Sequence, residues 1–238
     1  MAKPKILCLH GFAESGDIFR IRSRNIRALL EPHAELVYLD GPVDVGSLRF
    51  TSEEIADPQP SEFVNLAWWW KRGGKNIELR GLGQSLQLIQ DQIKEQGPFQ
   101  GILGFSQGAS LATIVAALLQ GTRVPGLPED LGQGPLDFVI LSGAFCVETP
   151  EHQLLYQTPI RTPSLHIMGE YDTVVGIDLS RKLASAFVDP KLFEFRGGHF
   201  IPLTAQCVKA VEEFVSPFVP GLNTGEAEAC EEGNVEEE

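Results

Sequence analysis

The chain has 238 residues, 43% of them hydrophobic, a size and composition that fit one large α/β domain. Its formal net charge is −13, yet no basic patch or basic helix is present, so a nucleic-acid partner is not expected. The chain contains no run of about 18 apolar residues, so a membrane span is not expected. The start of the chain lacks the pattern of a secretory signal peptide. Four cysteines without paired spacing, Cys8, Cys146, Cys207 and Cys230, predict free thiols in a cytoplasmic protein.

Apolar runs and turn residues predict the first elements in chain order. The run 5–11, KILCLHG, ends in glycine and predicts a buried strand, and 35–42, ELVYLDGP, predicts a second strand stopped by Gly-Pro. Between them, apolar residues at helical spacing predict a helix over 16–30. Residues 43–77 have a mixed character, and we expect a lid-like excursion with one short helix. A helix over 78–97 follows, with one apolar face and a glycine after its end.

The second half of the chain alternates strands with helices. The predicted elements are a strand over 99–105, a helix over 107–120, a Pro/Gly-rich loop over 121–135, strands over 136–143 and 164–169, a helix over 177–187, a strand over 191–195 and a closing helix over 204–214. Six strands, most of them separated by helices, predict the α/β class with a largely parallel sheet covered on both faces. Ligands bind such sheets beyond the carboxyl ends of the strands.

This division predicts one α/β domain over residues 1–220 and an acidic tail over 221–238. The tail holds seven glutamates, no basic residue and few apolar side chains, so we expect it to be disordered. A specific acidic docking segment is the alternative. Without the tail, the formal charge of the body is about −6, an ordinary value for a water-exposed surface.

The stretch GFSQG, residues 104–108, has the pattern of a nucleophile elbow. Its flanking glycines allow a sharp turn between strand and helix that lifts the Ser106 hydroxyl clear of the sheet. The pattern by itself also occurs by chance, and a helix-capping serine with packing glycines is the alternative. A serine hydroxyl is a poor nucleophile near neutral pH, so the hypothesis needs a base and a group that orients the base.

Three histidines follow the serine, and their positions differ. In this fold the chain order is serine, acid, histidine. His199, in FRGGHFIP, follows the last predicted strand and fits that order. His166 lies in the middle of a predicted strand, which favours a buried core residue. His152 precedes the penultimate strand and is out of order. We therefore predict His199 as the general base.

The acid is expected just beyond the penultimate strand. Asp172, in HIMGEYDTVV, lies at that position, and Glu170 two residues earlier is the alternative. Asp178 and Asp189 are more typical of a helix start and a turn. Without a serine and a histidine in the right order, Asp172 would be interpreted as a turn or cap residue.

Acyl transfer also needs donors for the oxyanion that develops on the substrate. The residue after the nucleophile supplies one, so we predict the backbone N–H of Gln107. The loop after the first strand supplies the other, for which we predict the N–H of Phe12, although His10-Gly11 can also simply end that strand. No phosphate-binding, metal-binding or dinucleotide motif is present, so neither a cofactor nor a metal is expected.

With these residues placed, the chain resembles the FSH family of serine hydrolases, which are α/β-hydrolases. The stretches LCLHGFAESGDIFR, GPFQGILGFSQGASLA, SLHIMGEYDTVV and GGHFIP carry the resemblance and span residues 7–202. The resemblance implies Ser106 as nucleophile, Asp172 as acid and His199 as base, in agreement with the assignment from the residues. The acidic tail lies outside the family pattern.

The cluster AWWWK is similar to a tryptophan-bearing segment of the family and implies Trp68, Trp69 and Trp70 as substrate-binding residues. Neighbouring side chains cannot all face one cavity, so at least one is expected to pack against the body. That all three are structural is the alternative.

Together these features predict a serine hydrolase that cleaves carboxylic esters or thioesters with an apolar acyl group through an acyl-enzyme on Ser106. The expected partner is a small-molecule or carrier-bound acyl substrate. Because some members of the family release polyketide acids from carrier-bound thioesters, a polyketide synthase carrier domain is a further candidate partner. A binding protein of the same fold without catalysis is the alternative of a different class, although no member of the predicted triad is missing.

Overall fold

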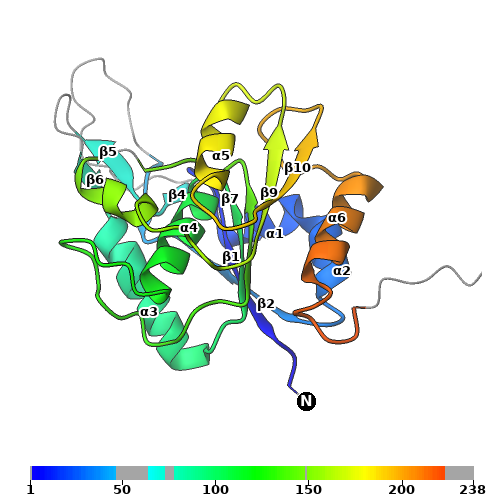
Figure 1. Cartoon of the computed structure of the whole chain (residues 1–238), viewed down its shortest axis with the longest axis horizontal. Helices are drawn as coiled ribbons and strands as arrows, with labels where there is room; N and C mark the ends of the chain where they lie inside the picture. The colour runs from blue at the N-terminus through cyan, green and yellow to red at the C-terminus, as the bar shows by residue number, and fades with distance from the viewer. Residues whose placement is uncertain (1, 47–63, 73–77, 148, 223–238) are drawn as a thin grey trace, which may run out of the picture.

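The computed structural model describes residues 2–46, 64–72, 78–147 and 149–222, and its centre is a six-stranded sheet (Figure 1). The strands are β1 (Lys5–Leu9), β2 (Glu35–Leu39), β7 (Gly101–Phe105), β8 (Phe138–Ser142), β9 (Ser164–Gly169) and β10 (Lys191–Phe195). Their order across the sheet is β10-β9-β8-β7-β1-β2, and every neighbouring pair is parallel. All six predicted strands are therefore present, and the predicted α/β class is confirmed.

The four central strands, β1, β7, β8 and β9, are apolar because both of their faces are buried. Successive side chains of a strand point to opposite faces, and the core is divided accordingly. In β1, Leu7 and Leu9 belong to one hydrophobic cluster, whereas Ile6 and Cys8 belong to the other. A continuous apolar run with this alternation supplies both cores at once.

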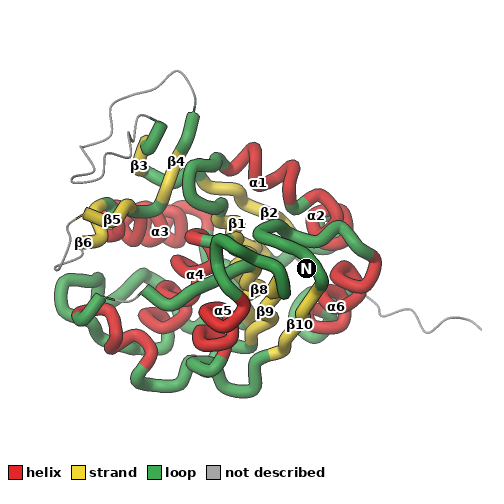
Figure 2. The backbone as a smooth tube through the Cα atoms, turned by 90° about the horizontal axis from the view of Figure 1, so that it is seen from above, coloured by secondary structure: helices red, strands yellow, loops and turns green. Residues whose placement is uncertain are grey.

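Helices cover the two faces in two groups, as Figures 1 and 2 show. One face packs against α3 (Leu82–Gln96), α4 (Gln107–Leu119) and α5 (Ile177–Ala184). The other face packs against α1 (Gly16–Arg22), α2 (Arg24–Leu30) and α6 (Ala205–Val215). Helix α4 is buried along its whole length, because it lies between the sheet and a short 3₁₀ helix, Glu151–Tyr156, that the sequence did not predict.

Two predicted helices have different bounds in the structure. The helix expected over 16–30 is divided at Ser23, whose hydroxyl donates to the Phe19 carbonyl at 2.8 Å and bonds the Tyr38 hydroxyl at 2.9 Å. The helix expected over 78–97 begins only at Leu82, because residues 78–80 form β6 (Glu78–Arg80). Pairing with β5 (Trp70–Arg72) overrides the local helical tendency there.

The excursion between β2 and α3 contains two small antiparallel pairs in its described part. One joins β3 (Val43–Asp44) to β4 (Leu66–Ala67), and the other joins β5 to β6. The short helix expected in the excursion is not found in 43–46 or 64–72, and the remaining residues, 47–63 and 73–77, lie outside the described residues.

The described residues continue two positions beyond the predicted boundary at residue 220. Leu222 is 5% exposed and belongs to the hydrophobic cluster under α6, so the folded body reaches at least this residue. The rest of the expected acidic tail, 223–238 with Cys230, lies outside the described residues. Among the described helices, none combines the length and apolar character needed to cross a bilayer.

Candidate active site

Ser106 forms a sharp turn between β7 and α4. Its backbone has φ 52° and ψ −117°, a conformation that residues other than glycine rarely adopt. The Ser106 N–H donates to the Ser142 carbonyl at 2.8 Å, and the Ser106 carbonyl accepts the Ser110 N–H at 3.0 Å, the first hydrogen bond of α4. The turn is thus held by the neighbouring strand on one side and by the helix on the other.

The two glycines that flank the serine are required by close backbone approach. A Cβ atom at Gly104 would lie 2.5 Å from the Cα atom of Ala109, and one at Gly108 would lie 2.2 Å from the Leu9 carbonyl oxygen. Both contacts are with backbone atoms that cannot move aside. The pattern GxSxG therefore reflects a helix packed directly against the strand before it and against β1.

Ser106, His199 and Asp172 form a continuous hydrogen-bonded chain. His199 Nε2 lies 2.8 Å from Ser106 Oγ, and His199 Nδ1 lies 2.6 Å from Asp172 Oδ2. Because a carboxylate only accepts, Nδ1 carries the ring proton, and Nε2 is left to accept the proton of the serine hydroxyl. The three side chains come from the loops after β7, β10 and β9, at the carboxyl ends of the strands.

Asp172 is fixed by the turn that it caps. Its Oδ1 accepts the N–H groups of Val174 at 2.9 Å and Val175 at 2.8 Å, so that Oδ2 is directed to His199. Its side chain is only 3% exposed. Glu170, the alternative acid, is exposed to solvent, and its backbone N–H pairs with the Phe195 carbonyl.

The other histidines lie elsewhere in the fold. His166 is buried in β9 beside Ser164, with Nε2 3.0 Å from the serine Oγ, and burial lowers its pKa to about 3. His152 lies in the 3₁₀ helix and bonds Thr149. Neither is joined to Ser106. Gly143 leaves room for the His199 ring, because a Cβ atom at Gly143 would lie 2.9 Å from His199 Cε1.

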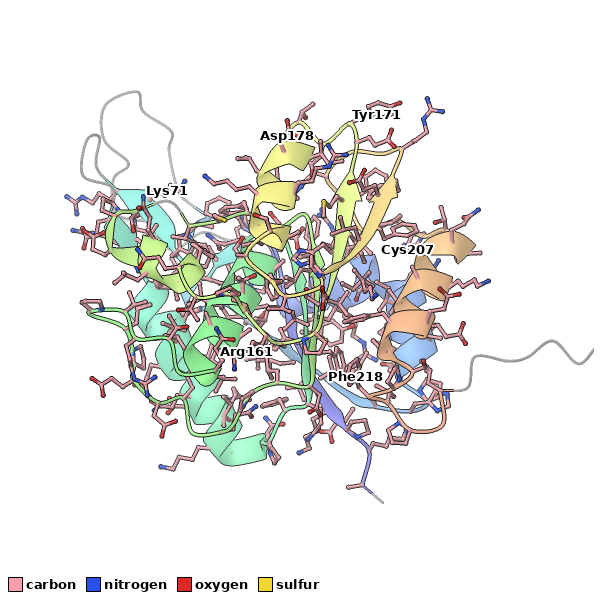
Figure 3. The ribbon with its side chains drawn as sticks, in the orientation of Figure 1. Lys71, Arg161, Tyr171, Asp178, Cys207 and Phe218 are labelled. Carbon is pink, nitrogen blue, oxygen red and sulfur yellow. The ribbon has the colours of Figure 1, made fainter. Side chains whose placement is uncertain are left out.

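A cavity of about 450 Å³ opens beside Ser106. Its lining is mostly apolar: Phe12, Trp69, Trp70, Phe145, Val174, Val175 and Leu179, with Lys71 and Gln107 as the further polar members. In Figure 3, Lys71, Tyr171 and Asp178 all lie toward the upper end of the molecule, and Phe218 lies near the opposite end. The upper end is the one at which β9 and β10 end (Figure 1).

The three tryptophans have different surroundings. Trp69 and Trp70 border the cavity, whereas Trp68 does not. Trp68 and Trp69 are both buried, with 0% and 1% of their surface exposed, and the Trp68 indole Nε1–H donates to the His10 carbonyl at 2.8 Å. Trp70 is only partly buried. The structure thus places Trp68 in the core, and a substrate-binding role for Trp69 and Trp70 stays a prediction.

Gln107 and Ser85 hold this tryptophan segment. The side-chain oxygen of Gln107 accepts the Trp68 N–H at 2.8 Å, and its Nε2 donates to the Trp69 carbonyl at 2.7 Å. The Ser85 hydroxyl donates to the Trp68 carbonyl at 2.6 Å. The residue after the nucleophile thus ties the cavity wall to the elbow through its side chain.

The two predicted oxyanion donors border the same cavity. Gln107 is the first residue of α4, and Phe12 lies in the loop after β1. No hydrogen bond within the described residues takes up the backbone N–H of either one. His10 supports that loop: its Nε2 accepts the Gly41 N–H at 2.8 Å and its Nδ1–H faces the Gly11 carbonyl at 2.7 Å. Burial lowers the pKa of His10, in keeping with a neutral ring.

Sequence reasoning missed part of the site. Phe145, Val174 and Leu179 form cavity wall, but their sequence surroundings resemble ordinary loop and helix positions. Val174 and Leu179 are 69% and 45% exposed, a signal that only the structure contains. Within the described ranges, no group of three or more His, Cys, Asp or Glu side chains lies close enough together to hold a metal ion.

A parallel sheet with a strained serine turn, followed in the chain by an acid loop and a histidine loop, defines the class of serine hydrolases with the α/β-hydrolase fold. The family model for serine hydrolase (FSH1) matches residues 1–211. The chain belongs to this family, and it is an enzyme that hydrolyses ester or thioester bonds.

The relatives agree with this conclusion, and the solved structures share the fold. The chain is 31% identical to Esterase OVCA2 of Danio rerio over 90% of its own length and 97% of that protein, and 36% identical to Esterase OVCA2 of Bos taurus over 90% and 96%. Among solved structures, acyl-protein thioesterase 2 of Zea mays has the same fold, with a TM-score of 0.64, 17% identity, and coverage of 91% of this chain and 94% of that one.

Proposed function

We propose that the protein hydrolyses carboxylic esters or thioesters with an apolar acyl group, with Ser106 as nucleophile, His199 as base and Asp172 as the acid that orients the base. The observation that carries the proposal is the hydrogen-bonded chain from Asp172 through His199 to Ser106, which ends at the mouth of a mostly apolar cavity.

The geometry supports a two-step reaction. Ser106 Oγ attacks the substrate carbonyl carbon while its proton moves to His199 Nε2, and Asp172 stabilises the imidazolium through Nδ1–H. The oxyanion of the tetrahedral intermediate accepts from the N–H groups of Phe12 and Gln107. As the intermediate collapses, the bond to the leaving group breaks, and the alcohol or thiol takes the proton from Nε2. This leaves the acyl group bonded to Ser106 Oγ. His199 Nε2 then takes a proton from a water molecule as the water attacks the acyl carbonyl carbon; when this second intermediate collapses, the bond to Ser106 Oγ breaks, Oγ regains the proton from Nε2, and the carboxylic acid leaves.

The cavity favours an apolar acyl chain. Trp70 and Phe145, which are only partly buried, provide aromatic surface next to the nucleophile, and each buried methylene contributes about 0.8 kcal/mol. We expect kcat/KM to rise with acyl length from acetyl to about octanoyl, in line with that contribution. The acyl-protein thioesterase in the comparison supports testing thioesters beside oxygen esters. A release of polyketide acids from a carrier domain, predicted from the family resemblance, has no support of this kind.

The test is an acyl series from acetyl to octanoyl on paired oxygen esters and thioesters, together with labelling by a fluorophosphonate probe. An activated serine reacts with the probe, whereas a binding protein of the same fold does not. No labelling and no turnover would contradict the proposal. Turnover that does not change with acyl length would retain the reaction but remove the apolar specificity.

A further inference from the structure

Glu14 is a buried carboxylate beside the candidate active site that the mechanism above does not use. It lies in the loop between β1 and α1, and its side chain is 8% exposed. One carboxylate oxygen accepts the Gly11 N–H at 3.1 Å, and the other pairs with the Arg22 guanidinium of α1. Its backbone pairs with Leu66 of β4, with N–H to carbonyl distances of 3.2 Å and 2.8 Å. Glu14 therefore joins its own loop to a helix and to the excursion.

The loop that Glu14 holds is the one that carries the Phe12 N–H. Ala13, which lies between Phe12 and Glu14 in the chain, has φ 57°, a left-handed conformation that costs free energy in residues other than glycine. The bond from Gly11 and the backbone pairing with Leu66 lie on either side of this turn. They keep the loop in a shape that it would not prefer alone, and with it the position of the Phe12 N–H.

Glu14 is also close to His199. At Gly11, a Cβ atom would lie 3.0 Å from the Phe105 ring and 3.2 Å from the Glu14 carboxylate, so both groups border Gly11. The Phe105 ring packs on His199, with ring centroids 4.9 Å apart. Phe105 therefore lies between the Glu14 loop and His199. Burial raises the pKa of Glu14, while the charges of Arg22 and His199 lower it.

The negative charge of Glu14 is not required for its hydrogen bond with Gly11. A glutamine at this position could accept the Gly11 N–H without the cost of burying an ionised group. Arg22 offsets that cost only in part, because its side chain is 53% exposed and its charge is screened by water. A carboxylate kept at a cost beside an active site is a sign that the charge has a use.

We propose that Glu14 is a positioning residue of the hydrolytic site: it fixes the loop that presents the Phe12 N–H, and its charge favours the imidazolium form of His199. The proposal rests on the proposed function. When the Ser106 proton reaches His199 Nε2, Asp172 stabilises the new positive charge directly, and Glu14 stabilises it more weakly from the other side. The proton then leaves with the alcohol or thiol, and Glu14 itself neither gains nor loses one.

Two variants separate the two parts of the role. Glu14→Gln retains an acceptor for the Gly11 N–H but removes the charge, whereas Glu14→Ala removes both. The matched control is Glu31→Gln, which removes a carboxylate that also pairs with arginines of α1 and α2, Arg20 and Arg27. For each variant, kcat and KM on a butanoyl oxygen ester are measured per active site, counted by fluorophosphonate titration, together with Tm and the pH profile.

For Glu14→Gln we expect kcat to fall about fivefold with KM nearly unchanged, since the charge acts on the transition state. The acid limb of kcat/KM should move to lower pH, because the loss of a nearby negative charge disfavours the protonated imidazole. For Glu14→Ala we expect a loss in kcat of about 100-fold, the size found when an oxyanion donor is lost. Glu31→Gln should match the wild type.

The proposal is overturned if both Glu14 variants retain the wild-type kcat per titrated site and the wild-type acid limb, even when their Tm falls. That result would leave Glu14 with a role in folding alone. Failure of the proposed function gives a different result, because the wild-type protein itself would then neither react with the probe nor cleave the ester.

Discussion

The nucleophile turn, residues 101–110, and the tryptophan segment, residues 64–72, border the same cavity but are held in different ways. The turn lies between two buried elements, and its shape is set by backbone contacts at Gly104 and Gly108. The segment contains strands of only two and three residues and depends on side-chain hydrogen bonds from Gln107 and Ser85. Ser106 is thus positioned by packed backbone, whereas the tryptophan wall of the cavity is attached to the body by side-chain hydrogen bonds.

Because of this difference, we expect the reaction at Ser106 and the shape of the cavity wall to be changed by different mutations. A change in the turn alters backbone packing and affects every substrate, whereas a change in the segment can reshape the cavity wall and leave the triad in place. Gln107 is the exception, because its backbone belongs to the turn and its side chain holds the segment.

The largest expected effect comes from Ser106→Ala, which tests whether the turn alone carries the chemistry. We expect kcat/KM to fall about 10⁴-fold or more on every ester, because the nucleophile is lost. Tm should stay close to that of the wild type. Ser110→Ala, one turn along α4, is the control and should still react with a fluorophosphonate. A Ser106→Ala protein that retains a tenth of the wild-type rate would exclude Ser106 as the nucleophile.

A smaller loss is expected when the acid is replaced. Asp172→Asn should lower kcat about 10³-fold, because an amide donor facing Nδ1 favours the wrong tautomer of His199. Glu170→Gln should have little effect, since this side chain is exposed to solvent. Both are measured as kcat with one short-chain ester. If Glu170→Gln proved the more damaging of the two, the acid would have to be reassigned.

Alanine substitutions at Trp68 and at Trp70 should have different effects, because one ring lies in the core and the other borders the cavity. Trp70→Ala should lower kcat/KM about tenfold for octanoyl esters and leave acetyl esters nearly unchanged, through lost apolar contact. Trp68→Ala should instead lower the free energy of unfolding by about 3–5 kcal/mol, because it empties a buried site. The measurements are the acyl series and denaturant unfolding. Equal losses at all chain lengths in Trp70→Ala would place that ring in the core.

The last predictions concern pH, which should affect activity through His199 and stability through His166 in the sheet. A general base must be neutral, and histidine side chains titrate near neutrality, so kcat/KM should fall as the pH drops below about 7. A flat profile down to pH 5 on folded protein would contradict His199 as base.

Stability should fall over the same range for another reason. Burial lowers the pKa of His166 to about 3, whereas a histidine in the unfolded chain titrates near 6.5. Between these values the unfolded chain binds more protons, so the free energy of unfolding decreases as the pH falls, by at most about 1.4 kcal/mol per pH unit. His166→Leu should flatten this dependence in urea unfolding at pH 7 and pH 5. An unchanged slope would show that other groups control acid stability.

Much of the fold and of the candidate site could be predicted from the sequence. Short apolar runs bounded by turn residues placed all six strands, since the central strands of a sheet covered on both faces need apolar side chains throughout. The order along the chain, together with positions just beyond predicted strands, selected Ser106, Asp172 and His199, with Glu170 left as the alternative acid, and the structure brings the three together. These features are local in the chain or follow from the topology, and a sequence records both directly.

What the tertiary structure alone decided depends on partners that are distant in the chain. Trp68, Trp69 and Trp70 are identical residues in a row, yet the first two are buried and Trp70 is only partly so. The hydrogen bonds that hold the segment join it to Gln107, Ser85 and His10, which are distant in the chain. Residues 78–80 have a helical pattern, but β5 makes them a strand. Periodicity reports how a segment is exposed on average, whereas the direction of one side chain is set by hydrogen bonds and packing with segments that no local pattern specifies.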